Sequence, residues 1–239
     1  MTEELLIVAG EASADLHAAR ALAELRALRP GVRAFGVGGP RLRASADFEA
    51  IAPAEDISVM GLAEVLPRIP RILSILNQLA RAADARRPRA ALLVDLPDFN
   101  LRLAKKLKAL GIPVVYYVSP QVWAWRQGRA KKIARLVDRM LCILPFEPRY
   151  YEGTGLAARF VGHPFAEKPA PGPKEGYRAA LGLAAARTTI ALVPGSRPSE
   201  LRRIFPPMLE AAERIRAAHP DAQFVVPVAP TLPREALAP

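Results

Sequence analysis

The nine residues Leu92–Asn100 read LLVDLPDFN, an apolar run that stops at two carboxylates, Asp95 and Asp98, on either side of Pro97. Pro97 fixes the entry to a helix, and Asp98 suits the cap of a helix that begins near Phe99. Asp95 ends an apolar strand, where partial desolvation tends to raise the pKa of a carboxyl group and suits a general base. The pattern alone leaves two interpretations of Asp95, a catalytic base and an ordinary strand end.

Similar apolar runs recur along the chain and alternate with stretches of helical spacing. Such alternation is typical of βαβ units and of a parallel sheet covered on both faces, so we expect an α/β fold. The expected strands are 5–9, 34–37, 90–94, 114–118, 139–144, 159–161, 190–193 and 224–226, and the expected helices include 14–28, 101–110, 129–137 and 206–218.

Proline-rich sequence without periodicity at 164–176 predicts an interdomain linker. Residues 1–163 before it hold enough strands for a complete Rossmann-like domain. Residues 177–239 hold only two expected strands, too few for an independent doubly wound sheet. We therefore expect two parallel-sheet domains, of which the second is partial.

The composition describes a globular protein with a strong positive charge. The 239 residues are 51% hydrophobic and carry a formal net charge of +11, which favours nucleic acid, phosphorylated metabolites or an acidic membrane as partners. The single cysteine, Cys142, lies in an apolar run and predicts a buried thiol. The three histidines are far apart and indicate no metal site. Without a signal peptide or a spanning segment, we expect a cytoplasmic protein that attaches at most to a membrane face.

Ligands of open parallel sheets bind beyond the carboxyl ends of the strands, so the loops there are candidate sites. The first such loop offers Gly10 for a tight turn and Ser13 to cap the next helix, flanked by Glu11 and Asp15. Its free N–H groups could hold a phosphate or a sugar hydroxyl. An ordinary βα turn is an equally good interpretation. The loop lacks GxGxxG, so no dinucleotide cofactor is indicated.

The loop after strand 114–118 reads SPQVWAWR and carries Trp123, Trp125 and Arg126. Its tryptophans could stack bases, wall a site or, for Trp123 above all, fill the core. A further loop after strand 190–193 reads PGSRPSE and carries Gly195, Ser196, Arg197 and Glu200. A glycine turn at a helix start with an arginine suits a diphosphate, whereas a capped turn with a solvated arginine is the alternative.

Residues 60–79 combine an apolar stripe at helical spacing with arginines and two prolines. A helix that faces the core is one interpretation, and a surface for lipid chains or a membrane interface is the other. The residues of the candidate lipid patch are Met60, Leu62, Val65, Leu66, Arg68, Ile69, Arg71, Ile72 and Leu73.

In order along the chain stand the motifs AGEASADLHAAR, FGVGGPRL, ISVMGLAEVLPRIPRIL, VDLPDFNLRLAKKLK, VSPQVWAWRQGRAKKI, LPFEPRYYEGTG, FVGHP and LVPGSRPSELRRI. Together they resemble lipid-A-disaccharide synthases, over essentially the whole chain. The resemblance implies an inverting glycosyltransferase with the two-domain GT-B fold. It would join UDP-2,3-diacylglucosamine to 2,3-diacylglucosamine 1-phosphate (lipid X), without metal or cofactor, at the cytoplasmic face of the inner membrane of a Gram-negative bacterium.

Carried onto this sequence, the resemblance makes Asp95 the general base and Arg197 the holder of the UDP diphosphate, with Glu200 in the same motif. The N-terminal domain would bind the acceptor and its acyl chains, and the C-terminal domain the UDP-sugar. Asp95 and Arg197 are then expected to face each other across a cleft. The family's first loop reads GEASGD, and here Ala14 replaces its second glycine, which costs stability if that site needs positive φ. Family members also continue past Pro239, and the missing part holds elements that bind the nucleoside, so activity of this chain itself is open.

The alternatives are an inactive relative or fragment of this family, another GT-B enzyme such as a UDP-N-acetylglucosamine transferase or epimerase, and a basic module that binds single-stranded nucleic acid. The motif VSPQVWAWR argues against the second, and phosphorylated, lipid-linked substrates account for the positive charge without nucleic acid. The sequence leaves the acyl-chain lengths and the oligomeric state open, a homo-oligomer included.

Overall fold

The computed structural model describes residues 3–58, 66–124, 128–167, 171–229 and 232. The contacts divide the chain into two units, Met1–Lys168 and Pro169–Pro239. The division falls inside the segment 164–176 that was expected as a linker. That segment is not structureless, because it contains the 3₁₀ helix η4 (Pro164–Glu167) and the start of helix α7 (Lys174–Ala180).

A seven-stranded parallel sheet forms the centre of the first unit, with the strand order β3-β2-β1-β4-β5-β6-β7. Strand β1 pairs with β2 on one side and with β4 on the other, so the order reverses between β1 and β4. The strands are β1 (Glu4–Ala9), β2 (Arg33–Gly38), β3 (Phe48–Pro53), β4 (Ala90–Val94), β5 (Val114–Tyr117), β6 (Arg139–Cys142) and β7 (Ala157–Phe160).

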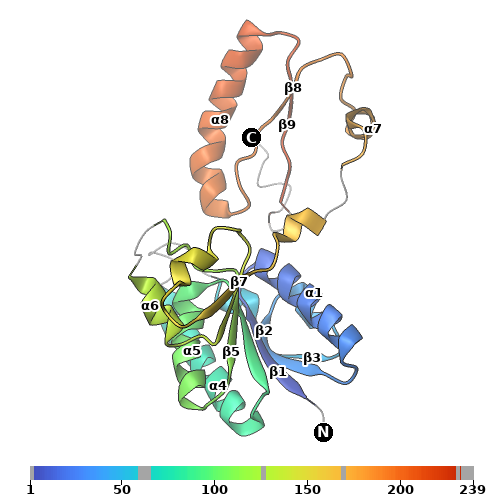
Figure 1. The fold of residues 1–239 in the computed structure, drawn as a ribbon. Helices are drawn as coiled ribbons and strands as arrows, with labels where there is room; N and C mark the ends of the chain where they lie inside the picture. The colour runs from blue at the N-terminus through green and yellow to red at the C-terminus, as the bar shows by residue number, and fades with distance from the viewer. Residues whose placement is uncertain (1–2, 59–65, 125–127, 168–170, 230–231, 233–239) are drawn as a thin grey trace. The chain divides into compact units, whose positions relative to one another are not determined.

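Helices cover both faces of this sheet (Figure 1). They are α1 (Ala12–Leu28), α2 (Pro40–Arg43), α4 (Ile69–Arg86), α5 (Pro97–Ala109) and α6 (Arg129–Ala134), with 3₁₀ helices η1 (Ala54–Asp56), η2 (Leu66–Arg68) and η3 (Pro148–Tyr151).

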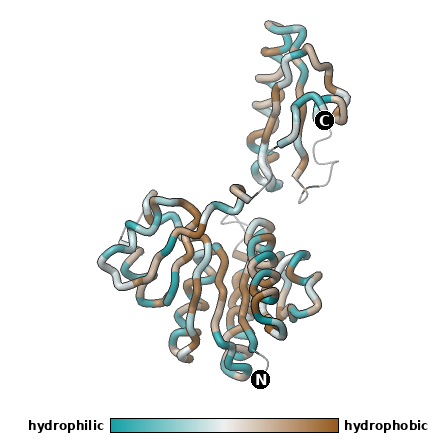
Figure 2. Tube along the Cα trace, turned by 45° about the vertical axis from the view of Figure 1, so that its right-hand side comes forward, coloured by the Kyte–Doolittle hydropathy of each residue, from teal (hydrophilic) through white to brown (hydrophobic). Residues whose placement is uncertain are grey.

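The core consists of two apolar layers, one on each face. Successive side chains of a strand point to opposite faces, so Leu6 and Val8 pack with α4, α5 and α6, whereas Ile7 and Ala9 pack with α1 and α2. All four side chains are fully buried. Figure 2 shows hydrophobic residues along the strands and a mixture of hydrophobic and hydrophilic residues on the helices. The expected α/β architecture with a doubly covered parallel sheet is confirmed.

Strand β4 occupies the residues expected for it, whereas β3 was not predicted. The β3 sequence, FEAIAP, mixes alanine, glutamate and proline, and only its pairing with β2 makes it a strand. Strand β6 ends at Cys142, two residues earlier than expected. Beyond it, the N–H groups of Ile143 and Leu144 donate to the side chain of Glu147 and not to a neighbouring strand.

In the second unit, a parallel pair of strands, β8 (Thr189–Ala191) and β9 (Gln223–Val225), is joined by helix α8 (Pro198–Ala218). The helix begins eight residues before the expected start at 206, and it contains Pro206 and Pro207 in its interior. Helix α7 precedes β8 in the sequence of this unit. Together, β8, α8 and β9 make one βαβ unit of a Rossmann-like domain.

Candidate active site

The strand order reverses between β1 and β4. The segments that follow these two strands leave the sheet toward opposite faces. Ala9 pairs with Val94, the last residues of the two strands, so Gly10 and Asp95 follow neighbouring strands at the same edge. Helix α1 continues from β1 to one face, and α5 continues from β4 to the other. Such a switch point is where doubly wound sheets open a crevice for ligands.

Asp95 occupies a strained turn at this edge. Its φ angle is 51° and that of Leu96 is 48°, so two successive non-glycine residues adopt the left-handed conformation. Each such residue costs roughly 1–2 kcal/mol, and backbone outliers of this kind cluster at functional sites. The side chain of Asp95 is half-buried. A third outlier, Val118 with φ 68°, follows the adjacent strand β5 at the same edge.

Gly10 is needed here for space and not for a turn angle. A Cβ atom on Gly10 would lie 2.6 Å from Cδ2 of Leu96 and 3.2 Å from Cδ1 of Ile57. No positive φ was found at Gly10, so the tight turn that the sequence suggested is not what the position requires. Glycine lets the loop after β1 and the strained turn after β4 come into contact.

The predicted helix caps are wrong at two positions. Helix α1 begins at Ala12 with Glu11 as its N-cap, so Ser13 lies inside the helix and is exposed. Helix α5 begins at Pro97, with Leu96 as an N-cap residue that makes no side-chain cap bond. Asp98 therefore lies in the first turn, where its exposed carboxylate pairs with Arg129 at 3.3 Å. Pro97 already occupies a preferred position at the helix start.

Asp15 and Ala14 have structural roles in helix α1. The carboxylate of Asp15 is 2% exposed and accepts backbone N–H groups of Gly39 at 2.9 Å, Arg41 at 2.9 Å and Leu42 at 3.1 Å. It thereby caps the short helix α2, and its role as a ligand-binding residue stays a prediction. Ala14 lies inside α1 with a helical backbone, so the replacement of the family's glycine brings no strain there.

Trp125 and Arg126 lie outside the described residues, so only the start of their loop can be placed. Trp123 stacks edge-on against Phe146 with ring centroids 5.4 Å apart. The hydroxyl groups of Ser119 and Tyr151 form a buried hydrogen bond of 2.8 Å at the base of the same loop. Trp123 is half-buried and Phe146 is 36% exposed, so this contact does not decide among the three interpretations of Trp123.

The loop before α8 in the second unit is organised around Glu200. One oxygen of its carboxylate accepts the N–H groups of Ser196 at 2.9 Å and Arg197 at 3.2 Å, and the other accepts from the Arg197 guanidinium at 3.0 Å. These donors, the Ser196 N–H above all, hold the pKa of Glu200 below its usual value. Gly195 has a φ of 116°, and a Cβ atom there would collide with Glu200. An incoming anion would compete with Glu200 for these N–H groups.

The apolar segment 60–79 divides into two parts. Met60, Leu62 and Val65 lie outside the described residues. In η2 and at the start of α4, the exposed fractions of Leu66, Ile69 and Leu73 are 63%, 39% and 41%. Further along the helix Ile75, Leu76 and Leu79 are buried, and Ile72 is half-buried. The core interpretation therefore holds for the second half of the stripe, and an exposed apolar surface remains at the first.

Both arginines of this patch bond to residues of the neighbouring helix η1. Arg68 donates to the carbonyl oxygen of Glu55 at 3.4 Å, and Arg71 contacts Asp56 at 2.7 Å. Pro70 lies in the first turn of α4 and starts the helix rather than breaking it. No helix in the described part of the chain is long and apolar enough to cross a membrane.

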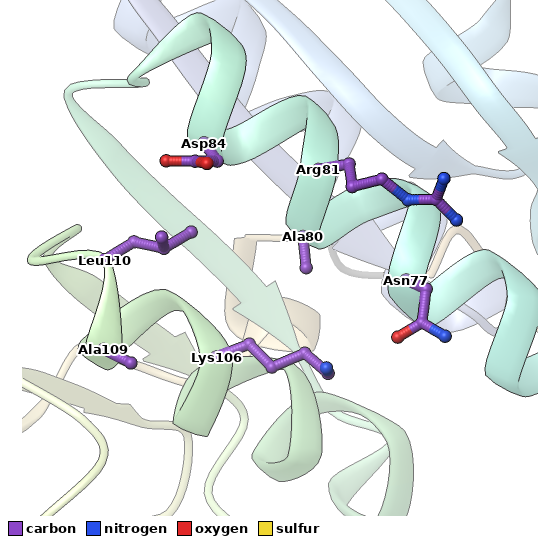
Figure 3. A pocket seen from close by; sticks show the side chains of 7 residues that line it. All are labelled: Asn77, Ala80, Arg81, Asp84, Lys106, Ala109 and Leu110. Carbon is purple, nitrogen blue, oxygen red and sulfur yellow. The ribbon is translucent and has the colours of Figure 1, made fainter.

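A separate groove of about 370 Å³ lies between α4 and α5 (Figure 3). It is lined by residues of the two helices, Asn77, Ala80, Arg81, Asp84, Lys106 and Ala109, and by Leu110. The groove lies between the outer helices and not at the strand ends. Among the described residues, no three His, Cys, Asp or Glu side chains form a cluster that could hold a metal ion.

Three residues at the strand-end edge were not predicted from the sequence. Asn100 and Tyr116 contact the backbone of Asp95, and His17 lies 6.0 Å from the ring of Tyr117. Burial, together with Arg20 and His163, lowers the pKa of His17. Tyr116 gives no signal within an apolar strand, but Asn100 is a polar residue on the apolar face of α5, which is a usable signal.

Known proteins resemble this chain over nearly all of its length. A family model described as lipid-A-disaccharide synthetase matches residues 5–237. Lipid-A-disaccharide synthase of Anaeromyxobacter sp. (strain K) is 80% identical over 239 residues, which are 100% of this chain and 62% of that protein. The protein of the same name from Myxococcus xanthus (strain DK1622) is 58% identical over 232 residues, 97% of this chain and 60% of that one. The chain thus spans less than two thirds of these curated relatives.

Solved structures share the fold at low identity. UDP-GlcNAc 2-epimerase from Neisseria meningitidis bound to UDP-GlcNAc has a TM-score of 0.60 and 13% identity, over 98% of this chain and 67% of that chain. UGT2 of Phytolacca americana complexed with UDP-2fluoro-glucose and pterostilbene has a TM-score of 0.53 and 10% identity, over 96% and 72%. At such identities the likeness shows the fold alone, the GT-B class built of Rossmann-like units.

Proposed function

The chain belongs to the lipid-A-disaccharide synthetase family, and from that premise we propose that the protein is an inverting glycosyltransferase of lipid A biosynthesis. Its donor is UDP-2,3-diacylglucosamine and its acceptor is 2,3-diacylglucosamine 1-phosphate, lipid X. The products are UDP and a β-1,6-linked disaccharide 1-phosphate. The proposal is supported by a relative that is 80% identical and bears the name lipid-A-disaccharide synthase.

Asp95 acts as the general base in this proposal. The acceptor 6-hydroxyl loses its proton to the carboxylate as its oxygen forms a bond to the anomeric carbon of the donor. The bond from that carbon to the diphosphate oxygen breaks, and its electron pair leaves with UDP. General-base assistance of this kind contributes on the order of 10²–10⁴ in rate.

Arg197 holds the diphosphate of the donor and stabilises the charge that grows on it as the bond breaks. A guanidinium suits this role because it forms charge-assisted hydrogen bonds with phosphate oxygens. Glu200 keeps the loop and the arginine in place when no donor is bound, at 3.0 Å from the guanidinium. The donor diphosphate then takes over the N–H groups at the start of α8.

The strained turn at Asp95 is the single observation that carries the proposal. The residue lies at the switch point of a doubly wound sheet, with φ of 51° there and 48° at Leu96. A carboxylate kept at the strand-end edge at such conformational cost suits a reactive group better than an ordinary strand end.

The exposed side chains of Leu66, Ile69 and Leu73 support contact with acyl chains at the cytoplasmic face of the inner membrane. Vesicles that contain anionic phospholipid test this surface by co-sedimentation. Replacement of Leu66 and Leu73 by serine is expected to reduce the bound fraction, and unchanged binding would contradict the surface. The matched control is Leu28→Ser, which changes an exposed leucine at the far end of α1.

Release of UDP from the diacylated donor in the presence of lipid X tests the function. The chain is assayed as it is and in a form continued past Pro239 with the corresponding residues of the Anaeromyxobacter relative. We expect turnover in the continued form that requires both acylated substrates, and loss of turnover in Arg197→Ala. Turnover of unacylated UDP-N-acetylglucosamine, or epimerisation of it, would overturn the proposal in favour of another UDP-sugar enzyme. Oligonucleotide binding without any response to UDP would overturn it in favour of a nucleic-acid-binding module.

A further inference from the structure

The backbone oxygen of Asp95 is held by two side chains from different elements. The Tyr116 hydroxyl of β5 donates to it at 2.6 Å, and the Nδ2 of Asn100 in α5 donates to it at 2.7 Å. The N–H of Asp95 donates in turn to the carbonyl oxygen of Tyr117 at 2.9 Å. Both backbone polar groups of Asp95, its N–H and its carbonyl oxygen, are therefore hydrogen-bonded.

Tyr116 contributes a hydroxyl group that is fully buried. The residue has 0% exposure, so its ring is part of the core, and its hydroxyl reaches the carbonyl oxygen of Asp95 from the buried side. Burial above all, and then the nearby charge of Asp95, raises the pKa of Tyr116 well above its usual value. The hydroxyl therefore stays protonated and remains a donor at any pH at which the protein would work.

The burial of Asn100 has a cost in free energy that packing alone does not explain. It is 0% exposed on an otherwise apolar face of α5, and its Oδ1 has no hydrogen-bond partner among the described residues. A buried acceptor without a partner costs about 1–3 kcal/mol. Its Nδ2 bridges the carbonyl oxygens of Val94 at 3.2 Å and Asp95 at 2.7 Å. The two acceptors fix the orientation of the amide, because a flipped amide would place its oxygen against them.

These contacts fall where the backbone is strained. A left-handed conformation at two successive residues persists only where surrounding structure determines it. Leu96 is held from the other side as well, because its carbonyl oxygen accepts the N–H groups of Phe99 at 3.2 Å and Asn100 at 3.0 Å. The turn thus has its polar groups fixed by β5 and by the first turn of α5.

We propose that Tyr116 and Asn100 are positioning residues, which hold Asp95 in its strained conformation so that its carboxylate meets the acceptor hydroxyl. The inference rests on the proposed function, because it assigns to Asp95 the role of base. Neither side chain reaches the substrate in this account; both act through the backbone of Asp95. A misplacement of about 1 Å at a reacting group can cost roughly 10²-fold in rate.

Tyr116→Phe is the decisive variant, because it removes one hydroxyl and leaves the buried ring in place. In the continued form of the chain we expect kcat to fall by about 10- to 100-fold with KM for both substrates within about 2-fold. Asn100→Ala is expected to lower kcat further, but it also opens a cavity and reduces stability. Tyr151→Phe is the matched control for the loss of a buried hydroxyl hydrogen bond, here with Ser119, and its kcat should fall by much less than that of Tyr116→Phe.

A double-mutant cycle separates positioning from a general loss of structure. If Tyr116 acts through Asp95, Tyr116→Phe lowers the residual turnover of Asp95→Asn by less than about 2-fold, since the base is already absent. An equal loss in both backgrounds, or unchanged kcat in the single variant, would overturn the positioning role.

Amide hydrogen exchange gives a second readout that needs no activity. In the chain as it is, Tyr116→Phe should speed exchange at the N–H of Asp95 by at least about 10-fold relative to Tyr151→Phe. Unchanged exchange would overturn the inference. Near wild-type turnover in Asp95→Asn would instead remove the general base from the proposed function, and the exchange experiment would still decide whether Tyr116 holds the turn.

Discussion

Gly10 and Leu96 touch across the point where the strand order reverses, so closely that a Cβ atom on Gly10 would lie 2.6 Å from Cδ2 of Leu96. One residue follows β1, and the other follows β4 in a left-handed conformation. The loop that opens α1 and the turn that carries Asp95 are therefore packed as one piece. A Cβ atom added at Gly10 must displace the side chain of Leu96.

Gly10→Ala should consequently lower both stability and turnover. Overpacking of a filled site costs typically 1–3 kcal/mol, and the new Cβ atom would meet the side chains of both Leu96, at 2.6 Å, and Ile57, at 3.2 Å. Urea unfolding measures the loss, and kcat in the continued form measures the effect on Asp95. Gly176→Ala is the control, since a Cβ atom there meets no atom within 4 Å and the position is helical. Equal behaviour of the two variants would mean that Leu96 adjusts freely.

Asp15→Asn should lower the free energy of unfolding by about 2–3 kcal/mol without a specific effect on KM. The carboxylate accepts three backbone N–H groups of the α2 start, and hydrogen bonds to charged groups are worth about 1.5–3 kcal/mol. An asparagine must turn its NH₂ toward at least one of these donors. Glu24→Gln on the exposed side of the same helix is the control. A stable variant with a raised KM would instead assign Asp15 to the substrate site.

Glu147→Gln should flatten the pH dependence of stability. Burial raises the pKa of Glu147 above 4.5, so the folded protein binds the proton more readily than the unfolded chain. The stability contribution is therefore full below pH 4.5 and is lost as pH rises through the folded pKa. Glutamine still offers an oxygen to the N–H groups of Ile143 and Leu144. Thermal unfolding should show a Tm at neutral pH at least equal to that of the wild type, with exposed Glu152→Gln as a control. A marked fall in Tm at neutral pH would show that the charge itself is needed.

Glu200→Gln should act in the opposite pH range. Its pKa is lowered by the Ser196 N–H and by Arg197, so its stabilising contribution is present above about 4.5 and is lost as pH falls through the folded pKa. We expect a lower Tm than that of the wild type at neutral pH and no difference in strong acid. Glu175→Gln, in the first turn of exposed α7, is the control. A difference that persists in strong acid would show that the capping geometry, not the charge, is responsible.

The sequence predicted what depends on local pattern. The run ALLV before Asp95 is apolar at every position, and β4 begins and ends where expected because such a run is buried on both faces. The glycine turn before a helix singled out Arg197 and Glu200, which form a capped turn there, and their binding of a diphosphate stays a prediction. In each case neighbours in sequence are also neighbours in space.

The features that the sequence did not predict depend on partners distant in sequence or on backbone angles. Asp15 meets the start of α2 more than twenty residues away, and its neighbours in the sequence give no hint of that contact. Ser13 and Asp98 were wrongly assigned as caps, because both helices start earlier than the apolar spacing indicates. The left-handed angles of Asp95 and Leu96 have no sequence signal, since neither residue is glycine.

The turnover of Asp95→Asn, measured as UDP release from the diacylated donor with lipid X, tests the central claim most directly. Asparagine keeps the shape and the hydrogen-bonded backbone but cannot accept the proton of the acceptor hydroxyl. The account predicts a fall in kcat of about 10²–10⁴, with KM for both substrates little changed. Turnover within a few-fold of the wild type would contradict it, because a strained carboxylate at the sheet edge would then have no part in the proton transfer.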